Sequence, residues 1–248
     1  MAPRSSSAAA RSPRPAFLGV DVGGTFTDLA LFMPDGAVRC VKVPSTPANP
    51  GRSTLAGIDE LRELEPLAGA VWPALHHTHS STVATNALIE RAGAVVGMLT
   101  TRGFRDLFEL QRLVTSHPLR FDARRPQPLV PRYLVRDVAG RIDAAGSEHT
   151  PLDEVELVAA ARELRAEGAE ILVVCFLHSY RNPRHERAAR AALAGALPDL
   201  RVELSSEVWP QAREFERATL TTVNAHVRPI VESYLRDLEE GLAARGIA

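Results

Sequence analysis

The chain has 248 residues, of which 45% are hydrophobic and 24% charged, and 29 basic side chains against 30 acidic ones leave a formal charge of -1. These values describe a globular protein of one large or two small domains with its own hydrophobic core. The chain lacks the excess of basic residues found in proteins that bind nucleic acid or anionic lipid over their whole surface. The strongly apolar run over 171–177 is far shorter than the roughly 20 residues of a membrane-spanning helix. We therefore expect no nucleic-acid partner and no membrane span.

The distribution of lysine, glycine and cysteine excludes several enzyme classes. Lys42 is the only lysine, and Val41 precedes it, so the chain has no phosphate-binding loop of the G-x-x-x-x-G-K-[ST] type. It also has no G-x-G-x-x-G fingerprint and no G-x-S-x-G elbow. Cys40 and Cys175 stand far apart in apolar stretches, which indicates two buried thiols, no cysteine zinc site and a reducing, cytoplasmic location.

The predicted elements begin with strands. Residues 1–15 contain three prolines, a serine run and no acidic residue, so we expect a disordered tail. Strands are predicted over 17–22, 28–33 and 37–43, and Pro34-Asp35-Gly36 between the last two is a strong hairpin signal. The fold should therefore open with three antiparallel strands. Further elements follow in this order: a helix over 52–64, a short strand over 75–78, a helix over 82–91 and a buried strand over 94–100.

The second half of the chain predicts an alternation of helices and strands. Residues 110–149 are rich in proline and weakly periodic, which indicates an irregular excursion or a small added sheet. A helix capped by Thr150, with Pro151 at its first position, should end at Gly168. The later elements are a buried strand over 171–177, a helix from Asn182 and Pro183, a strand over 201–204 and a terminal helix broken by Pro229.

The segment Asp21-Val22-Gly23-Gly24-Thr25-Phe26-Thr27-Asp28 carries the most chemical information. Adjacent glycines let the backbone approach a phosphate, their N–H groups can point at its oxygens, and Thr25 adds a hydroxyl. Asp21, at the end of a strand, can hold Mg²⁺ while the metal bridges nucleotide phosphates. The alternative is a plain tight turn that Asp21 caps.

A second polar segment lies at the start of the helix over 82–91. His79 and the hydroxyls of the three residues after it, where a strand meets a helix N-terminus, could hold an anion. The alternative is that Ser81 simply caps the helix. His77 and His79 share one strand face, yet no carboxylate completes a local cluster, so a metal site there is the less favoured interpretation.

These segments together resemble the N-terminal domain of the hydantoinase A and 5-oxoprolinase family, whose relatives include acetone carboxylase β subunits. The resemblance covers nearly the whole chain from residue 17, and its ordered set of segments is far more specific than any one of them. It rests on residues 19–28, 79–91, 103–106, 128–132, 174–180, 214–217 and 223–225.

The resemblance implies a fold. This is the α/β fold of the N-terminal half of an actin-like ATPase (ribonuclease H-like), with a mixed sheet, an opening three-stranded antiparallel unit and later βαβ units. It places the N-terminal domain at 16–228 and makes 229–248 a helix leading towards a missing C-terminal half. The apolar stripe of that helix should then be partly exposed; it consists of Ile230, Val231, Tyr234, Leu235, Leu238 and Leu242.

The resemblance also implies an activity, the ATP-dependent opening of a cyclic amide such as a hydantoin or 5-oxoproline. Phosphorylation of the amide oxygen by ATP would create a leaving group, and positioning and charge neutralisation would do most of the catalysis. Carried over to this sequence, the catalytic residues are Asp21, Asp28 and His79, with Asp21 also holding Mg²⁺. The ATP contacts are Gly23, Gly24, Thr25 and Thr27, and the substrate contacts are Thr82, Thr85, Asn86 and Arg112.

The sequence departs from the family pattern at two places. Ser80 stands where the family usually has glycine, which would cost about 1 kcal/mol if that position needs positive φ. Leu110 to Leu113 alter a loop on the substrate side, where Arg112 could instead form an exposed salt bridge.

No second phosphate loop occurs, so we expect a C-terminal half or second subunit as partner. Two alternatives remain, a non-catalytic interaction subunit that keeps the fold and a sugar-kinase-like phosphotransferase. An ATPase assay with hydantoin, 5-oxoproline and hexoses would separate them from a cyclic-amide hydrolase.

Overall fold

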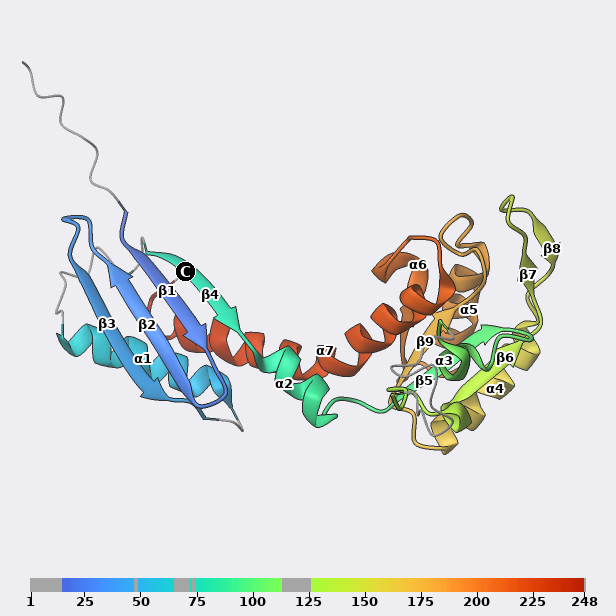
Figure 1. Cartoon of the computed structure of the whole chain (residues 1–248), viewed down its shortest axis with the longest axis horizontal. Coiled ribbons are helices and arrows are strands. Elements are labelled where there is room, and N and C mark those ends of the chain that lie inside the picture. Colours follow the sequence, from blue (N-terminus) through green and yellow to red (C-terminus); the bar gives the residue numbers. More distant parts are fainter. Residues whose placement is uncertain (1–14, 47–48, 65–71, 73–74, 113–125, 248) are drawn as a thin grey trace, which may run out of the picture. The chain divides into compact units, whose positions relative to one another are not determined.

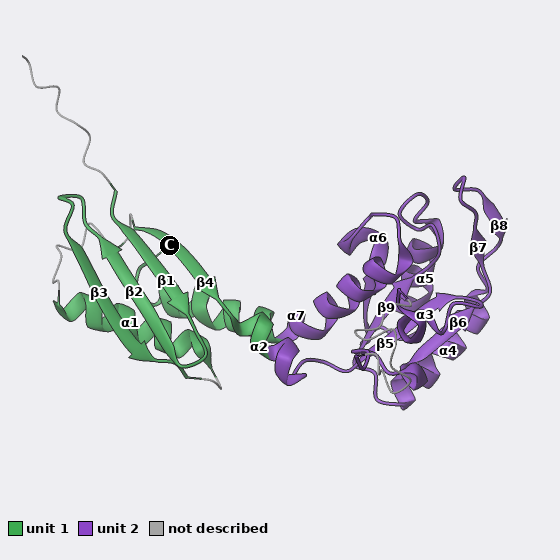
Figure 2. Ribbon diagram, in the orientation of Figure 1, with its two compact units in different colours: residues 1–86, 230–248 green, residues 87–229 purple. Residues whose placement is uncertain are grey.

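The computed structural model describes residues 15–46, 49–64, 72, 75–112 and 126–247. The chain divides into two compact units (Figure 2): unit 1 comprises residues 1–86 and 230–248, and unit 2 comprises residues 87–229. This division differs from the single domain predicted over 16–228, because the terminal segment belongs to the same unit as the first strands. Apart from Pro15, the predicted tail lies outside the described residues.

Unit 1 is built on a four-stranded mixed sheet in the order β3-β2-β1-β4 (Figure 1). Its strands are β1 (Phe17–Val22), β2 (Phe26–Phe32), β3 (Val38–Pro44) and β4 (His76–Ser81). β1, β2 and β3 pair antiparallel, as predicted, and β4 pairs parallel with β1. The hairpin signal was therefore correct, and Phe32 faces Val38 across its turn.

Strand alternation gives this sheet a buried and an open face. Leu18, Val20 and Leu29 point to the buried face and are at most 4% exposed. They pack with Ile58 and Leu61 of α1 (Pro50–Leu64) in one apolar cluster. Because side chains alternate along a strand, the residues between them form the open face.

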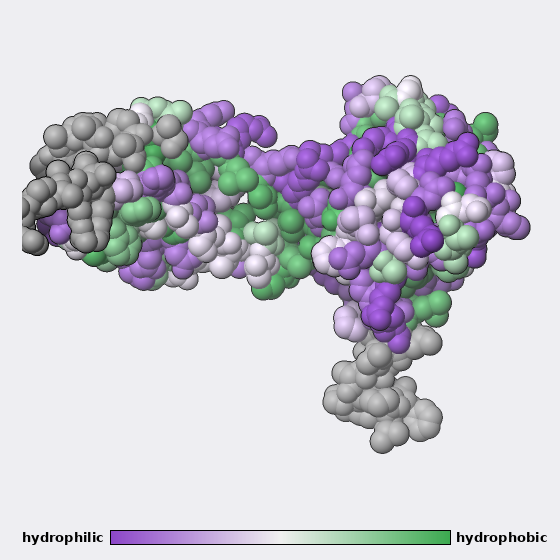
Figure 3. Space-filling view, turned by 90° about the horizontal axis from the view of Figure 1, so that it is seen from above, coloured by the Kyte–Doolittle hydropathy of each residue, from purple (hydrophilic) through white to green (hydrophobic). Residues whose placement is uncertain are grey.

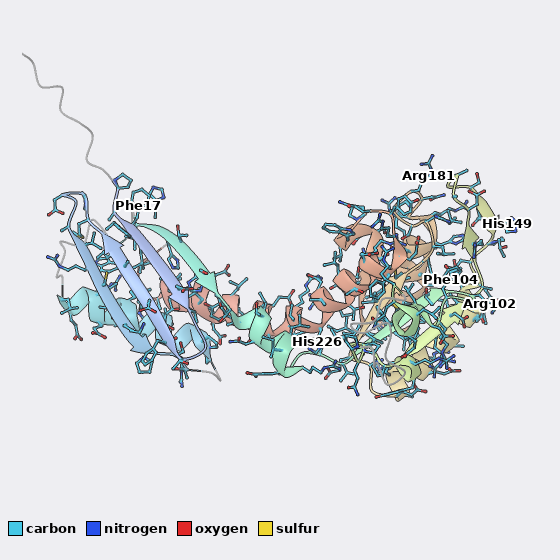
Figure 4. The ribbon with its side chains drawn as sticks, viewed as in Figure 1. Phe17, Arg102, Phe104, His149, Arg181 and His226 are labelled. Atoms are coloured by element: carbon cyan, nitrogen blue, oxygen red, sulfur yellow. The ribbon has the colours of Figure 1, made fainter. Side chains whose placement is uncertain are left out.

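The open face carries three rows of residues that the strand register sets side by side. The first row is large and mostly apolar: His76, Phe17, Phe32 and Val38. The second is small: Thr78, Gly19, Ala30 and Cys40. The third is polar: Ser80, Asp21, Asp28 and Lys42. Figure 4 labels Phe17 at the start of β1.

Cys40 is exposed in this face, so the prediction that its thiol is buried was wrong, whereas Cys175 is buried as expected.

Unit 2 contains a fully parallel sheet in the order β10-β9-β5-β6. Its strands are β5 (Val96–Thr101), β6 (Val135–Val138), β9 (Ile171–Cys175) and β10 (Arg201–Leu204). The helices α4 (Glu154–Ala166) and α5 (Arg184–Ala196) connect strands in βαβ fashion and share the apolar core. β7 (Arg141–Ile142) and β8 (Glu148–Thr150) form a small separate sheet, as one of the two predictions for 110–149 stated. The shorter helical segments are α2 (Val83–Glu90), α3 (Leu107–Leu110), η2 (Arg132–Leu134) and α6 (Ser205–Val208).

Two predicted helix boundaries were wrong. Thr150 ends β8, and α4 is capped instead by Asp153, whose carboxylate accepts a hydrogen bond from Glu156 N at 2.9 Å. Pro229 does not break the terminal helix, because α7 runs continuously from Glu214 to Ala243. A proline inside a helix removes one backbone donor and crowds the carbonyl group four residues earlier, which can kink a helix without ending it.

A buried ionic network anchors the first part of α7 within unit 2. Arg217 and Glu186 are both fully buried and both contact the Ser205 hydroxyl, at 2.9 and 2.6 Å. Arg217 also donates to Phe176 O at 2.6 Å, and Glu186 accepts from Phe176 N at 3.0 Å. The network therefore joins α7 and α5 to the end of β9.

Further along α7, still in unit 2, His226 (Figure 4) holds the chain segment before β5. Its Nε2 accepts from Gly93 N at 3.2 Å, so its Nδ1 carries the proton and donates to Ala94 O at 2.8 Å. A Cβ at Gly93 would lie 2.2 Å from His226 O, so only glycine fits this close approach.

No helix among the described residues is both long and apolar enough to span a bilayer. The face of unit 2 visible in Figure 3 is mostly hydrophilic, with scattered apolar side chains.

Candidate functional site

The glycine segment forms a turn between β1 and β2 that other parts of unit 1 hold in place. Gly23 N donates to Phe26 O at 3.0 Å and closes the turn. Ser45, just after β3, bonds the turn twice: its hydroxyl donates to Gly23 O at 2.8 Å, and its N–H donates to Thr25 O at 2.9 Å. The carbonyl groups of Gly23 and Thr25 are therefore satisfied from the protein side.

The N–H groups of Gly24 and Thr25 are left available. Within the described part of the chain neither donates a backbone hydrogen bond, and both residues are exposed. Two consecutive free N–H groups are the donors that an anion-binding turn offers.

The two glycines of the turn differ in how much room the fold leaves for a side chain. A Cβ on Gly23 would lie 3.0 Å from Phe26 O, which is too close for a relaxed fit. A Cβ on Gly24 would lie 3.5 Å from Asn86 Nδ2, an ordinary contact, and its φ is not in the left-handed region. The fold itself therefore does not require glycine at position 24, whereas close approach of a ligand to the backbone would.

Asp21 and Asp28 face each other across β1 and β2 on the open face, but their environments differ. Asp28 pairs with Lys42, whose Nζ lies 2.8 and 3.0 Å from its two oxygens. Among the described residues Asp21 has neither a hydrogen-bond partner nor an ion pair for its carboxylate, which is exposed. Asp21 is thus the free anionic group beside the glycine turn, and Asp28 is already neutralised.

Both carboxylates line a groove of about 440 Å³ on the open face, together with Lys42 and the row of small residues. Lys42 Nζ also lies 5.2 Å from the centre of the Phe26 ring. Lys42 is not among the site residues predicted from sequence. Two signals could have found it: it is the only lysine, and in a hairpin centred on Asp35 it is the residue opposite Asp28.

Thr27 does not reach this open face. Its side chain is fully buried, and its hydroxyl lies 3.0 Å from Ser45 Oγ and 2.8 Å from Ser53 Oγ. The Thr27 hydroxyl therefore faces the interior of unit 1, away from the open face on which the resemblance implied a contact with ATP.

The second polar segment lies beside the glycine turn. Thr82 N and Oγ1 both donate to Val22 O, at 3.1 and 3.3 Å, and Asn86 Nδ2 donates to Thr82 Oγ1 at 3.4 Å. Thr82 and Thr85 are exposed, and Asn86 is half-buried next to Gly24. The structure thus brings Thr82 and Asn86 near the turn, and Thr85 precedes Asn86 in α2.

The serines of this segment have structural explanations. Ser81 Oγ accepts from Val83 N at 3.1 Å, which matches the capping alternative. Ser80 lies in β4 opposite Asp21 and has no positive φ, so the strain expected from replacing glycine is absent.

His79 lies on the other face of the sheet from Asp21. It is opposite Val20 in the register, and its Nε2 is hydrogen-bonded to the Tyr234 hydroxyl on α7. Burial, and then the neighbouring His77, lower the pKa of His79 to about 4, so its ring is neutral near pH 7. The structure therefore does not group His79 with the two carboxylates, and alternation along β4 explains why.

Among the described residues no group of three or more His, Cys, Asp or Glu side chains could hold a metal ion. Magnesium bound with a nucleotide needs only one or two carboxylates, since phosphates and water supply the other ligands. Asp21 fits that role, and the histidines do not.

Arg112 belongs to unit 2, where its Nε lies 2.7 Å from Glu216 Oε1. Both side chains are well exposed, at 45% and 38%, and the arginine lowers the pKa of Glu216. Arg112 thus forms an exposed salt bridge in the structure, as the alternative interpretation of this residue stated.

Comparison with known proteins defines first the class and then the family. The chain superimposes on nucleotide-free acetone carboxylase with a TM-score of 0.85 at 29% identity, over 93% of this chain and 34% of that one. It superimposes on the ATP-dependent caprolactamase of Pseudomonas jessenii with a TM-score of 0.82 at 36% identity, over 94% and 34% of the two chains. The predicted α/β fold of the actin-like ATPase class with a mixed sheet is thereby confirmed.

Residues 17–196 match the family described as the hydantoinase/oxoprolinase N-terminal region, and the chain belongs to this family. Among relatives, the α subunit of caprolactamase from Pseudomonas jessenii is 38% identical, over 90% of this chain and 32% of that protein. The β subunit of acetone carboxylase from Xanthobacter autotrophicus is 30% identical, over 92% and 34%. The chain spans about a third of the length of these relatives.

Proposed function

We propose that this chain supplies the phosphate-binding part of an ATP-dependent enzyme that opens cyclic amides, in a cytoplasmic location. The observation that carries the proposal is the glycine turn, where two free N–H groups stand beside an unpaired carboxylate. Family membership supports the reaction class, since one relative is named an ATP-dependent caprolactamase and others are named 5-oxoprolinases.

The residues of the turn fit the groups that the reaction needs. The N–H groups of Gly24 and Thr25 would bind phosphate oxygens, and the missing side chain of Gly24 lets the backbone come close. Asp21 would hold Mg²⁺ next to those oxygens, because its carboxylate has no other partner in the described part of the chain. ATP, when bound, supplies the phosphoryl group that makes the amide oxygen a leaving group.

The roles of the other predicted residues divide by where they lie. Thr82, Thr85 and Asn86 would contact the substrate or the phosphates from the helix start beside the turn. Asp28 would act through its pair with Lys42, whose ammonium group also lines the groove. We propose that Thr27 supports the turn from inside and that His79 supports the sheet, both without touching the reacting atoms.

The rest of the catalytic site would come from protein outside this chain. The relatives are about three times as long, which supports a C-terminal half or a second subunit as partner.

The test is an assay of ATP consumption by the enzyme that contains this chain, with hydantoin, 5-oxoproline, caprolactam and a hexose in parallel. We expect a cyclic amide to stimulate ATP hydrolysis and to appear as its ring-opened acid. A phosphorylated hexose would instead establish a kinase, and no turnover with any compound would favour a non-catalytic subunit.

A further inference from the structure

Three hydroxyl groups connect the inside of unit 1 to the glycine turn. Thr27 on β2, Ser45 after β3 and Ser53 on α1 form this hydroxyl chain, with oxygen–oxygen distances of 2.8 Å from Ser53 to Thr27 and 3.0 Å from Thr27 to Ser45. Thr27 and Ser53 are at most 2% exposed. The chain ends at Gly23 O, 2.8 Å from the Ser45 hydroxyl.

Proton counting fixes two of the four contacts of the hydroxyl chain. Gly23 O can only accept, so the single Ser45 proton goes to it. Pro50 O likewise can only accept, and the single Ser53 proton goes to it at 2.8 Å. The one Thr27 proton then serves either Ser45 or Ser53. When it serves Ser45, Thr27 holds the Ser45 oxygen while the Ser45 proton points to the turn.

The bond from Ser45 fixes the direction of a peptide group. In a trans peptide the C=O of one residue and the N–H of the next point in opposite directions. Because Gly23 O is held on the protein side by Ser45, the N–H of Gly24 points away from it. A peptide between two glycines turns over more easily than any other, since neither residue has a Cβ to restrict it.

We propose that Ser45 is the positioning residue of the phosphate-binding turn, held in place by Thr27 and Ser53. It keeps the Gly23–Gly24 peptide in the orientation that presents the Gly24 N–H to a phosphate oxygen. This inference rests on the proposed function, but the orientation of the peptide can be measured without any nucleotide. It also gives Thr27 a role in phosphate binding although its buried hydroxyl faces away from the open face.

The test uses the chain labelled with ¹⁵N-glycine. The chain has 16 glycines, so the amide of Gly24 can be followed by NMR. In the wild type we expect one sharp Gly24 resonance. Ser45→Ala removes the donor, so the resonance should broaden or split as the peptide samples two orientations, and Ser45→Thr, which keeps a hydroxyl, should restore it. The Mg-ATP dissociation constant, measured by titration of the same samples, should rise about tenfold in Ser45→Ala and return in Ser45→Thr.

Thr100→Val is the matched control, because Thr100 is also buried and its hydroxyl donates to a backbone carbonyl, Cys175 O at 3.0 Å, within unit 2. It should leave both the Gly24 resonance and ATP binding unchanged. An unchanged Gly24 resonance in Ser45→Ala would overturn the proposal, as would an effect of Thr100→Val equal to that of Ser45→Ala. If wild-type chain bound no Mg-ATP at all, the proposed function would fail, and the resonance alone would decide the role of Ser45.

Discussion

At the scale of single residues, two carboxylates that face each other across a strand pair have different electrostatic partners. Asp28 is neutralised by Lys42, while Asp21 has no partner among the described residues. An unpaired carboxylate beside two free N–H groups is where a metal bound to a phosphate would find its ligand. The difference explains why we assign the metal to Asp21 alone.

Asp21→Asn should abolish turnover in the complete enzyme and leave folding intact. Asparagine keeps the volume but not the charge, and losing such a transition-state contact costs about 3 to 4 kcal/mol, or several hundredfold in kcat. Asp35→Asn, the same change in the exposed hairpin turn of unit 1, is the control and should leave turnover unchanged. ATP-coupled ring opening near the wild-type rate in Asp21→Asn would show that the metal is held elsewhere.

His77 and His79 should make the stability of unit 1 depend on pH. Burial lowers the pKa of both rings, that of His79 to about 4, whereas in the unfolded chain both titrate near 6.5. Between these values the unfolded state binds more protons, so the free energy of unfolding should fall as the pH decreases from 6.5 towards 4.

Thermal unfolding of the wild type and of His79→Gln across this range would check the dependence. The variant should show a shallower decrease than the wild type. Parallel curves would mean that the ring of His79 is not kept neutral by the fold.

At the scale of elements, Arg217 ties the first part of α7 to its neighbours through hydrogen bonds. Its guanidinium donates to the Ser205 hydroxyl and to the carbonyl groups of Phe176 and Gln211, all inside unit 2. The nearby Glu186 is equally buried and accepts three hydrogen bonds. The network therefore contains two charges whose burial depends on one another.

Arg217→Met should destabilise the chain by about 3 to 5 kcal/mol, because it leaves buried acceptors unpaired and Glu186 without a nearby cation. The double variant with Glu186→Gln should recover part of the loss, as coupled sites do. Arg190→Met, which breaks the exposed pair with Glu207, should cost at most about 1 kcal/mol. Denaturant unfolding measures all three, and an equal loss in the two arginine variants would contradict the account of the network.

Local signals allowed most elements to be predicted, and long-range contacts decided the rest. Alternation and the Asp-Gly turn correctly placed β1, β2 and β3, and the glycine motif identified the turn with free N–H groups. The face occupied by His79 follows from its parallel register with β1, which no local pattern shows. Ser45 and Ser53 were missed because they meet Thr27 from 18 and 26 residues away. Helix caps were ambiguous because Thr150 and Asp153 are both good caps three residues apart.

At the scale of the whole molecule, the apolar stripe of α7 is partly exposed, as its sequence predicted. Tyr234 and Leu238 are at most 5% exposed, and Leu242 packs against the core of unit 1. Leu235 remains 45% exposed. By contrast, Phe17, Phe32 and Val38 stand together on the open sheet face, each 45% exposed or more. A contiguous apolar row promotes association more than one isolated leucine does.

We therefore expect the chain to self-associate at high concentration through the open face. Phe32→Ser should reduce the association, while Leu235→Glu should leave it unchanged. Light scattering over a concentration series measures both variants. A reversed pattern, with Leu235→Glu alone restoring the monomer, would place the association at the α7 stripe instead.

The central claim is that the glycine turn binds the phosphates of ATP, and Gly24 gives its most direct test. Gly24→Ala adds one methyl group where the fold has room, and Gly195→Ala adds one in open space on α5. Calorimetric or NMR titration of the folded chain with Mg-ATP should give a dissociation constant on the order of millimolar for the wild type, near -4 kcal/mol, because an exposed turn leaves much of the nucleotide in water. We predict that Gly195→Ala binds like the wild type and that Gly24→Ala, with an unchanged melting temperature, binds at least about tenfold more weakly. Equal affinity of Gly24→Ala and the wild type would contradict the claim.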